Sequence, residues 1–182
     1  MRTALSIILA LALAHCKGPE PRKPEEVRSG SFYKESIERN KILLAKEERA
    51  IREIIEKDSA HRYIASPNGF WYYFEKENDT ARYLPKEGDQ ILFTHSLMTL
   101  AGDTLYTADE LGPTSHMVDR QQLFPGLQNA VKLLNINEKA TFLFPSDQAY
   151  GYQGDNKAIA PLTPLRASVE LHTIIIHKDS LN

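Results

Sequence analysis

The chain has 182 residues with 22 basic and 24 acidic side chains, and its formal net charge is −2. A hydrophobic fraction of 42% and a charged fraction of 25% are ordinary for a soluble globular protein, and the length allows one domain plus extensions. The near-neutral charge argues against the concentrated basic field of a nucleic-acid-binding protein, so we expect no nucleic-acid partner.

Residues 1–16 have the pattern of a secretory signal peptide. A positive start, Met1-Arg2, precedes a run from Ala4 to Ala14 that is apolar apart from one serine. A membrane-spanning helix needs about 20 apolar residues, so this run is too short to cross a bilayer. It has the length of a signal-peptide apolar region instead.

Cys16, the single cysteine of the chain, follows Leu13-Ala14-His15 at the end of that run. The spacing resembles a bacterial lipobox, although His15 stands where a small residue is usual. The alternative is an ordinary signal peptide with an incidental cysteine. Because Cys16 has no second cysteine to pair with in an oxidising compartment, we predict that it is lipidated. The protein would then be anchored to a membrane on the periplasmic side of the bacterial envelope. We favour the outer membrane, and the inner membrane is the alternative.

A tether and a helix follow the signal peptide. Residues 17–30 contain three prolines and no sizeable apolar side chain, which predicts an extended linker. Residues 31–60 show helical spacing of apolar positions, among them Ile37, Leu44 and Ile51 at intervals of seven. We favour a helix laid on its own domain, because two heptads are few for a coiled coil. Self-association through this helix is the alternative.

Beyond the helix, an aromatic run and several β-rich segments alternate with Gly, Pro and Asn turns. This pattern predicts an antiparallel α+β domain over residues 62–180. The expected strands lie near residues 70–74, 90–94, 104–107, 140–145 and 167–176, and one short helix covers 124–134.

Four motifs in this domain carry a resemblance to a known family. They are Phe124-Pro125-Gly126-Leu127, Ala149-Tyr150-Gly151, Ile159-Ala160-Pro161 and Val169-Glu170-Leu171. With these four motifs in this order, the chain resembles FKBP-type peptidyl-prolyl cis-trans isomerases. The lipobox, the N-terminal helix and the aromatic run resemble, more narrowly, the gliding-motility-associated FKBP-type lipoproteins of Bacteroidota. The resemblance implies an FKBP-like antiparallel sheet wrapped around one short helix.

The resemblance also implies an apolar pocket for a proline ring. Its residues would be Phe93, Leu105, Tyr106, Phe124, Leu127, Tyr150 and Ile159. Tyr150 would hydrogen-bond a substrate carbonyl. Ile159 would line the loop side of the pocket, with its backbone N–H facing the ligand.

Three of these positions depart from the family pattern. Leu127 stands where many members carry a tryptophan floor, and Tyr106 stands in place of an aspartate. Phe93 occupies the position of a pocket tyrosine and lacks its hydroxyl. Asp103 and Asp109 are nearby carboxylates, but neither falls in register. These departures imply adjusted or reduced catalysis.

The implied reaction needs no cofactor. Prolyl isomerisation breaks no covalent bond, and its barrier of about 18–20 kcal/mol reflects lost amide resonance. A dry apolar cup favours the twisted amide over the planar one. The six histidines do not cluster at metal-ligand spacing, so we expect no metal and interpret them as structural or surface residues.

Two functions remain open at this point. The first is a lipid-anchored isomerase that assists the folding of envelope proteins, and its partners would be proline-containing polypeptides. The second is a catalytically weak FKBP-like chaperone or structural subunit of an envelope complex, such as the gliding machinery. The preserved Tyr150 loop favours the first, and the altered pocket floor favours the second.

Overall fold

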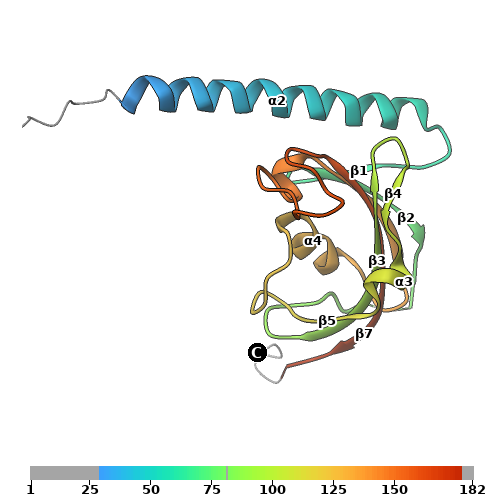
Figure 1. Cartoon of the computed structure of the whole chain (residues 1–182). Coiled ribbons are helices and arrows are strands. Elements are labelled where there is room, and N and C mark those ends of the chain that lie inside the picture. The colour runs from blue at the N-terminus through green and yellow to red at the C-terminus, as the bar shows by residue number, and fades with distance from the viewer. Residues whose placement is uncertain (1–28, 81, 178–182) are drawn as a thin grey trace, which may run out of the picture. The chain divides into compact units, whose positions relative to one another are not determined.

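An antiparallel sheet is the centre of the computed structural model, which describes residues 29–80 and 82–177. Six strands follow the order β1-β2-β6-β7-β3-β4, and β5 pairs with β3 outside this path. Helix α4 lies against one face of the sheet (Figure 1). The strands are β1 (Ile64–Ser66), β2 (Phe70–Lys76), β3 (Gln90–Thr99), β4 (Thr104–Tyr106), β5 (Thr114–Met117), β6 (Lys139–Phe144) and β7 (Leu165–Ile175). This arrangement confirms the predicted α+β class.

Strand β3 shows why these segments form a sheet. Alternate residues along it are buried, namely Ile91, Phe93, His95 and Leu97, while their neighbours are half-exposed. Strand residues point alternately to opposite faces, so this period of two places one apolar face on the core. The strand pairs along its whole length with β7, which alternates in the same way.

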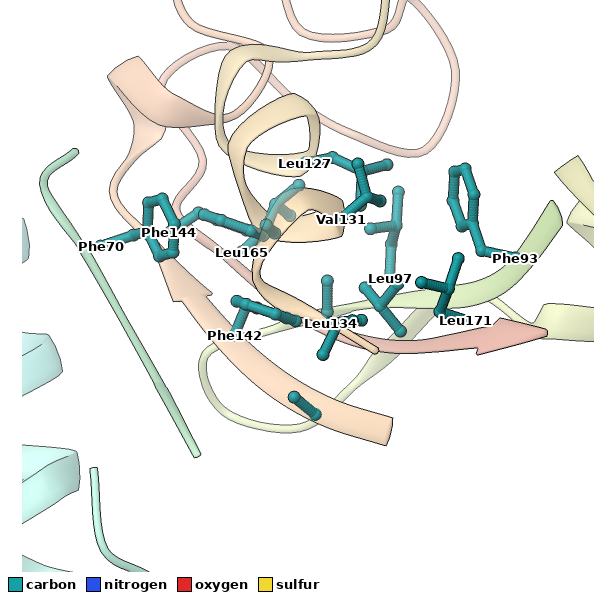
Figure 2. Close-up of a cluster of buried hydrophobic side chains, with 14 of the residues drawn as sticks. Phe70, Phe93, Leu97, Leu127, Val131, Leu134, Phe142, Phe144, Leu165 and Leu171 are labelled. Atoms are coloured by element: carbon teal, nitrogen blue, oxygen red, sulfur yellow. The ribbon is translucent and has the colours of Figure 1, made fainter. Parts of the chain in front are cut away.

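The core lies between the sheet and α4 (Pro125–Ala130), which continues as the short 3₁₀ helix η2 (Val131–Leu133). Proline at the first helical position is favourable because its ring presets the backbone angle and its missing N–H has no helical partner to lose. Figure 2 shows Leu127 and Val131 on this helix among the buried aliphatic and aromatic side chains. Each such side chain contributes about 1.5–3 kcal/mol by leaving water. The single helix expected over 124–134 is therefore two short helical pieces.

The N-terminal helix α2 (Ser29–Lys57) confirms the predicted helical extension, but its limits differ from the expected 31–60. Ser29 and Gly30 are helical and do not belong to the tether. The chain divides into two compact units, Met1–Ser36 and Ile37–Asn182, so most of α2 belongs with the sheet.

Within the second unit, α2 is held by buried contacts with the domain that contains the sheet. Ile51 is fully buried, and Glu47 is 6% exposed. The Arg52 guanidinium lies 5.9 Å from the centre of the Trp71 ring on β2. These contacts agree with a helix laid on its own domain. They also remove Ile51 from the face that self-association would have used.

Two short helices complete the described part of the chain. The predicted signal peptide, Cys16 and most of the tether lie outside the described residues. Helix α3 (Ala108–Leu111) follows β4, and the 3₁₀ helix η3 (Ser146–Gln148) follows β6. Within residues 29–80 and 82–177, no helix has the length and apolar character needed to cross a bilayer.

Candidate active site

A cavity of about 600 Å³ opens between the start of α4, the loop after η3 and the inner face of β3. Three residues predicted for the proline pocket, Phe124, Leu127 and Tyr150, line it together. The other lining residues are His95, Gln122, Leu123, Gln153 and Gly154. The structure thus brings residues from three distant segments to one hollow, whose lining combines apolar and polar side chains.

Aromatic packing sets the geometry of this cavity. Phe124 immediately precedes α4, and its ring centre lies 5.1 Å from that of Tyr150. On its other side Phe124 packs edge-on against Phe144 of β6, with ring centres 5.5 Å apart. Leu127 is 1% exposed beneath them. Because Phe144 is buried in the core, it ties the cavity wall to the sheet.

A hydrogen-bonded turn holds the loop that carries Tyr150. The Ser146 carbonyl accepts hydrogen bonds from the backbone N–H groups of Ala149 and Gly151, at 3.1 and 2.9 Å. The Glu47 carboxylate of α2 accepts two more, from the Ser146 N–H and from its hydroxyl, both at 2.8 Å. Both bonds are buried, so the N-terminal helix contributes directly to the position of the site loop.

A second contact in this region joins Tyr106 to Asp155. The Tyr106 hydroxyl donates a short hydrogen bond to one carboxylate oxygen of Asp155. The other oxygen accepts from the backbone N–H groups of Lys157 and Ile159, each at 2.8 Å. The Ile159 N–H is therefore engaged by Asp155 and does not face a ligand. Its side chain is 2% exposed and belongs to the core.

Hydrogen bonding and burial oppose each other at Asp155. Burial works to raise its pKa, but the Tyr106 hydroxyl and the backbone donors outweigh it and hold the pKa below the usual value. The same bond to Asp155 raises the pKa of Tyr106. The sequence reasoning missed Asp155 as a partner of Tyr106. The sequence offered one weak indication, because an aspartate in a turn commonly accepts a hydrogen bond from the N–H two residues further on.

Two further predicted residues lie outside the cavity lining. Phe93 is fully buried in the core, and Leu105 on β4 packs half-buried against it. His95 lines the cavity from the same face of β3 as Phe93. The interpretation of the histidines as structural or surface residues overlooked this place. Residues 93 and 95 lie on the same face of β3, because strand residues alternate between the two faces. Which of them lines the cavity depends on where α4 packs against that face.

The region that forms this cavity matches a known family. The family model for FKBP-type peptidyl-prolyl cis-trans isomerases matches residues 82–172, half of the chain. The chain belongs to the FKBP-type peptidyl-prolyl cis-trans isomerase family. It is an isomerase that acts on Xaa–Pro bonds, as the resemblance implied.

A solved structure shares the fold of this isomerase. It is a peptidyl-prolyl cis-trans isomerase from Pseudomonas syringae pv. tomato, 20% identical in sequence, with a TM-score of 0.60. The match covers 75% of this chain and 96% of the other. A comparison with curated proteins found no match. The FKBP-like fold is confirmed, and the narrower resemblance to gliding-motility lipoproteins stays a prediction.

Among the side chains that line the cavity, His95 has a strongly lowered pKa. It is 8% exposed, and its ring centre lies 5.4 Å from that of Phe93. Burial lowers the pKa of His95 from 6.5 to about 4, since desolvation penalises the charged imidazolium. The other titratable residue lining the cavity, Tyr150, has its pKa raised by burial. Both side chains are therefore neutral at pH 7.

We expect His95 to make the isomerase less stable in acid. The unfolded chain binds this proton with a pKa near 6.5 and the folded chain with one of about 4. Stability is therefore present above pH 6.5 and is lost as the pH falls towards 4, by about 3 kcal/mol in total. Urea unfolding from pH 7 to pH 4 should show a shallower loss for His95→Phe than for wild type.

His116 titrates in the same direction, because burial lowers its pKa as well. It is present in both proteins of this comparison, so its contribution cancels. Equal pH slopes for wild type and His95→Phe would contradict the assignment of a buried neutral imidazole.

Proposed function

We propose that the cavity formed by Phe124, Leu127, Tyr150 and His95 binds the proline of an Xaa–Pro bond and accelerates its isomerisation. One observation carries this proposal: Phe124, Leu127 and Tyr150, from a loop, a helix and a second loop, line the same hollow. The clients would be proline-containing polypeptides, as in the family as a whole.

The chemistry requires shape and a dry surface more than reactive groups. Twisting the amide removes its resonance and makes its carbonyl less polar, so water solvates the twisted state less well than the planar one. An apolar surface formed by Leu127 and Phe124 weakens that preference, because it excludes the water that stabilises the planar amide. Substrate and transition state are then distinguished by solvation, with no base or nucleophile involved.

Tyr150 supplies a fixed donor above that floor. Its raised pKa keeps the hydroxyl protonated at neutral pH. Within the described part of the chain, that hydroxyl makes no hydrogen bond, whereas the neighbouring hydroxyls of Tyr106 and Tyr152 bond Asp155 and Asn40. It is therefore available to donate to a carbonyl of the bound peptide, which orients the proline ring over Leu127.

A weak chaperone or structural subunit is the second candidate. It is favoured by Leu127, which gives a softer floor than tryptophan, and by Tyr106, whose hydroxyl is occupied by Asp155. In this alternative the cavity would retain affinity for proline-containing segments while turnover is low. As a chaperone the protein would bind its clients without isomerising them, and as a structural subunit it would belong to an envelope complex such as the gliding machinery.

The proposed setting is the periplasmic face of the bacterial envelope, with the chain held in the outer membrane by lipid on Cys16. The signal-like residues 1–16 and the single cysteine support it. Two or more acyl chains anchor a protein stably, since each buried methylene adds about 0.8 kcal/mol. Mass spectrometry of the membrane fraction should find acylated Cys16, and Cys16→Ser should release the protein. A soluble mature chain cleaved elsewhere would contradict the anchor.

Proline exchange measurements test the cavity. Cis/trans exchange of an Xaa–Pro peptide, followed by NMR, should be accelerated by the purified protein. Tyr150→Phe should lower kcat/KM by about tenfold, the effect of one lost hydrogen bond, and Phe124→Ala by more because the wall is removed. Tyr152→Phe is the matched control, since this tyrosine is two residues away and 60% exposed.

The outcomes separate the two candidates. Loss of activity in Tyr150→Phe but not in Tyr152→Phe supports the isomerase site. If the folded wild-type protein gives no acceleration yet binds an unfolded client, the chaperone function replaces it.

A further inference from the structure

A second hollow, of about 440 Å³, lies between α2 and the loops that join β6 to β7, outside the proposed proline cavity. All of its lining residues belong to the second compact unit of the chain. We name it the α2 groove, and its aliphatic side chains are Ile37, Leu43 and Leu44 of the helix and Leu162 of the loop before β7. Ile37 is 44% exposed, and the three leucines are only half-buried. The groove has the size of a small-ligand pocket, so it has room for a few side chains.

One loop forms a wall of both hollows. Tyr150, Gln153 and Gly154 line the proline cavity, whereas Gly151 and Tyr152 line the α2 groove. The two sites are therefore neighbours, because consecutive residues of the loop contribute to one and then to the other. An extended polypeptide spans about 3.3–3.6 Å per residue. A chain with its proline in the cavity thus reaches the groove within a few residues.

Hydrogen bonds fix both walls of the α2 groove. Glu47, one helical turn beyond Leu43, accepts two buried hydrogen bonds from Ser146, which itself lines the groove. On the loop side, the Leu162 N–H donates to the Gly151 carbonyl at 2.8 Å. The helix is therefore tied to one loop and that loop to the next, so the groove is formed before a ligand binds.

The backbone of Leu162 supports a role for its side chain. Its φ angle is 55°, in the left-handed region that bulky residues seldom adopt. Glycine or asparagine takes this conformation at lower cost. Strained residues of this kind cluster at ligand-binding sites. The apolar side chain, which lines the groove, gives a reason for a leucine at this position.

The size and surroundings of the groove restrict what fills it. Ten residues line it, whereas a stable interface with a second copy of the chain needs about 20–30 residues on each side. Residues 17–26 consist of lysine, arginine, glutamate, glycine and proline, so they supply no large apolar side chain. A polypeptide already held at the proline cavity needs to add only one or two apolar side chains.

We propose that the α2 groove binds an apolar side chain of the same polypeptide whose proline occupies the cavity. The inference rests on the proposed function, and it narrows the substrate class to clients with an apolar residue a few positions from the proline. Large apolar side chains are mostly buried in folded proteins and exposed in unfolded ones. The groove therefore directs the isomerase to unfolded chains.

The affinities of two 15-residue peptides for the purified full chain test the groove. Both peptides have a central Ala–Pro bond in a serine-rich sequence, and one of them carries two leucines on each side. The leucine peptide should bind wild type about tenfold more tightly, the effect of burying about one leucine side chain. Leu162→Asn and Leu44→Ser should remove most of this preference. Asparagine suits the left-handed backbone, so Leu162→Asn should fold.

Ile42→Ser is the matched control. Ile42 is 65% exposed on the same helix and does not line the groove, so this variant should keep the tenfold preference. If the preference survives in Leu162→Asn and Leu44→Ser, the leucines bind elsewhere and the inference is wrong. A wild-type dimer that Leu44→Ser dissociates in analytical ultracentrifugation would place a second copy in the groove and also overturn it.

The same peptides separate this inference from the proposed function. If wild type isomerises both peptides and binds them equally well, the inference is wrong while the proline site stands. If folded wild type neither binds nor isomerises either peptide, the proposed function fails and the inference fails with it.

Discussion

The substitution Gly126→Ala, which adds one methyl group, should strongly destabilise the isomerase and remove most of its activity. An ideal Cβ at this position of α4 would lie 2.4 Å from the Phe144 ring and 2.6 Å from the Gln148 carbonyl oxygen. Neither atom can move freely, because Phe144 is fully buried and the Gln148 N–H donates a backbone hydrogen bond to the Pro145 carbonyl. Overpacking of this kind costs typically 1–3 kcal/mol and can cost more, and here we expect about 3 kcal/mol.

The loss of activity has the same cause. Gly126 lies between Phe124 and Leu127 in sequence, and Gln148 is two residues before Tyr150. Any shift that relieves the clash must therefore separate the start of α4 from the Tyr150 loop, which are two walls of the cavity. Urea unfolding and proline exchange measure the two effects.

A matched control for this prediction is Asn129→Ala in the same helix. Asn129 is half-buried, and its side-chain amide donates a hydrogen bond to the Pro125 carbonyl one turn back. Alanine is a good helix former, so this change should cost less than about 1 kcal/mol. If Gly126→Ala is as stable as Asn129→Ala, the close packing of α4 on β6 and η3 is not what the structure describes.

Glu47→Ala is expected to have the second largest effect. The Glu47 carboxylate is the acceptor for both the N–H and the hydroxyl of Ser146, each at 2.8 Å in a buried environment. Its removal leaves two buried donors unpaired, at about 1–3 kcal/mol each, so we expect a loss of about 3 kcal/mol. Glu47→Gln keeps one acceptor oxygen and should lose about half as much.

The same change should also loosen the Tyr150 loop. The Ser146 carbonyl accepts the turn hydrogen bonds from Ala149 and Gly151. If Ser146 loses its bonds to Glu47 it becomes more mobile, and the turn should become more mobile with it. Faster amide hydrogen exchange at Tyr150 and a lower kcat/KM should accompany the lower stability. Glu53→Ala is the control, because Glu53 is exposed on the same helix and should change stability by less than about 0.5 kcal/mol. Indistinguishable Glu47→Ala and Glu53→Ala proteins would show that α2 does not support the site.

Much of the sheet could be predicted because strand signals are local. The aromatic run of β2 and the alternation of β3 and β7 each lie within about ten consecutive residues, and period-two burial follows from strand geometry alone. The limits of helices were less certain, since residues 29 and 30 proved helical and the helix at 124–134 divides into α4 and η2. Helix ends depend on neighbouring packing as well as on local preference.

The candidate site was predictable only in part. Phe124, Leu127 and Tyr150 were identified from short motifs, and the structure places all three around one cavity. That His95 also lines this cavity was not predicted. Phe93 and His95 share a face of β3, and the sequence of the strand does not determine which of them α4 leaves uncovered.

The amino-acid sequence by itself determined the α+β class, the family and the loop that carries Tyr150, because those depend on local patterns and contiguous motifs. The tertiary structure alone decided which further residues lie at the candidate site. Asp155 meets Tyr106 across 49 positions, and Glu47 meets Ser146 across 99. Contacts between such distant positions depend on how the sheet, α2 and α4 pack together, since no short-range preference brings those side chains within hydrogen-bonding distance.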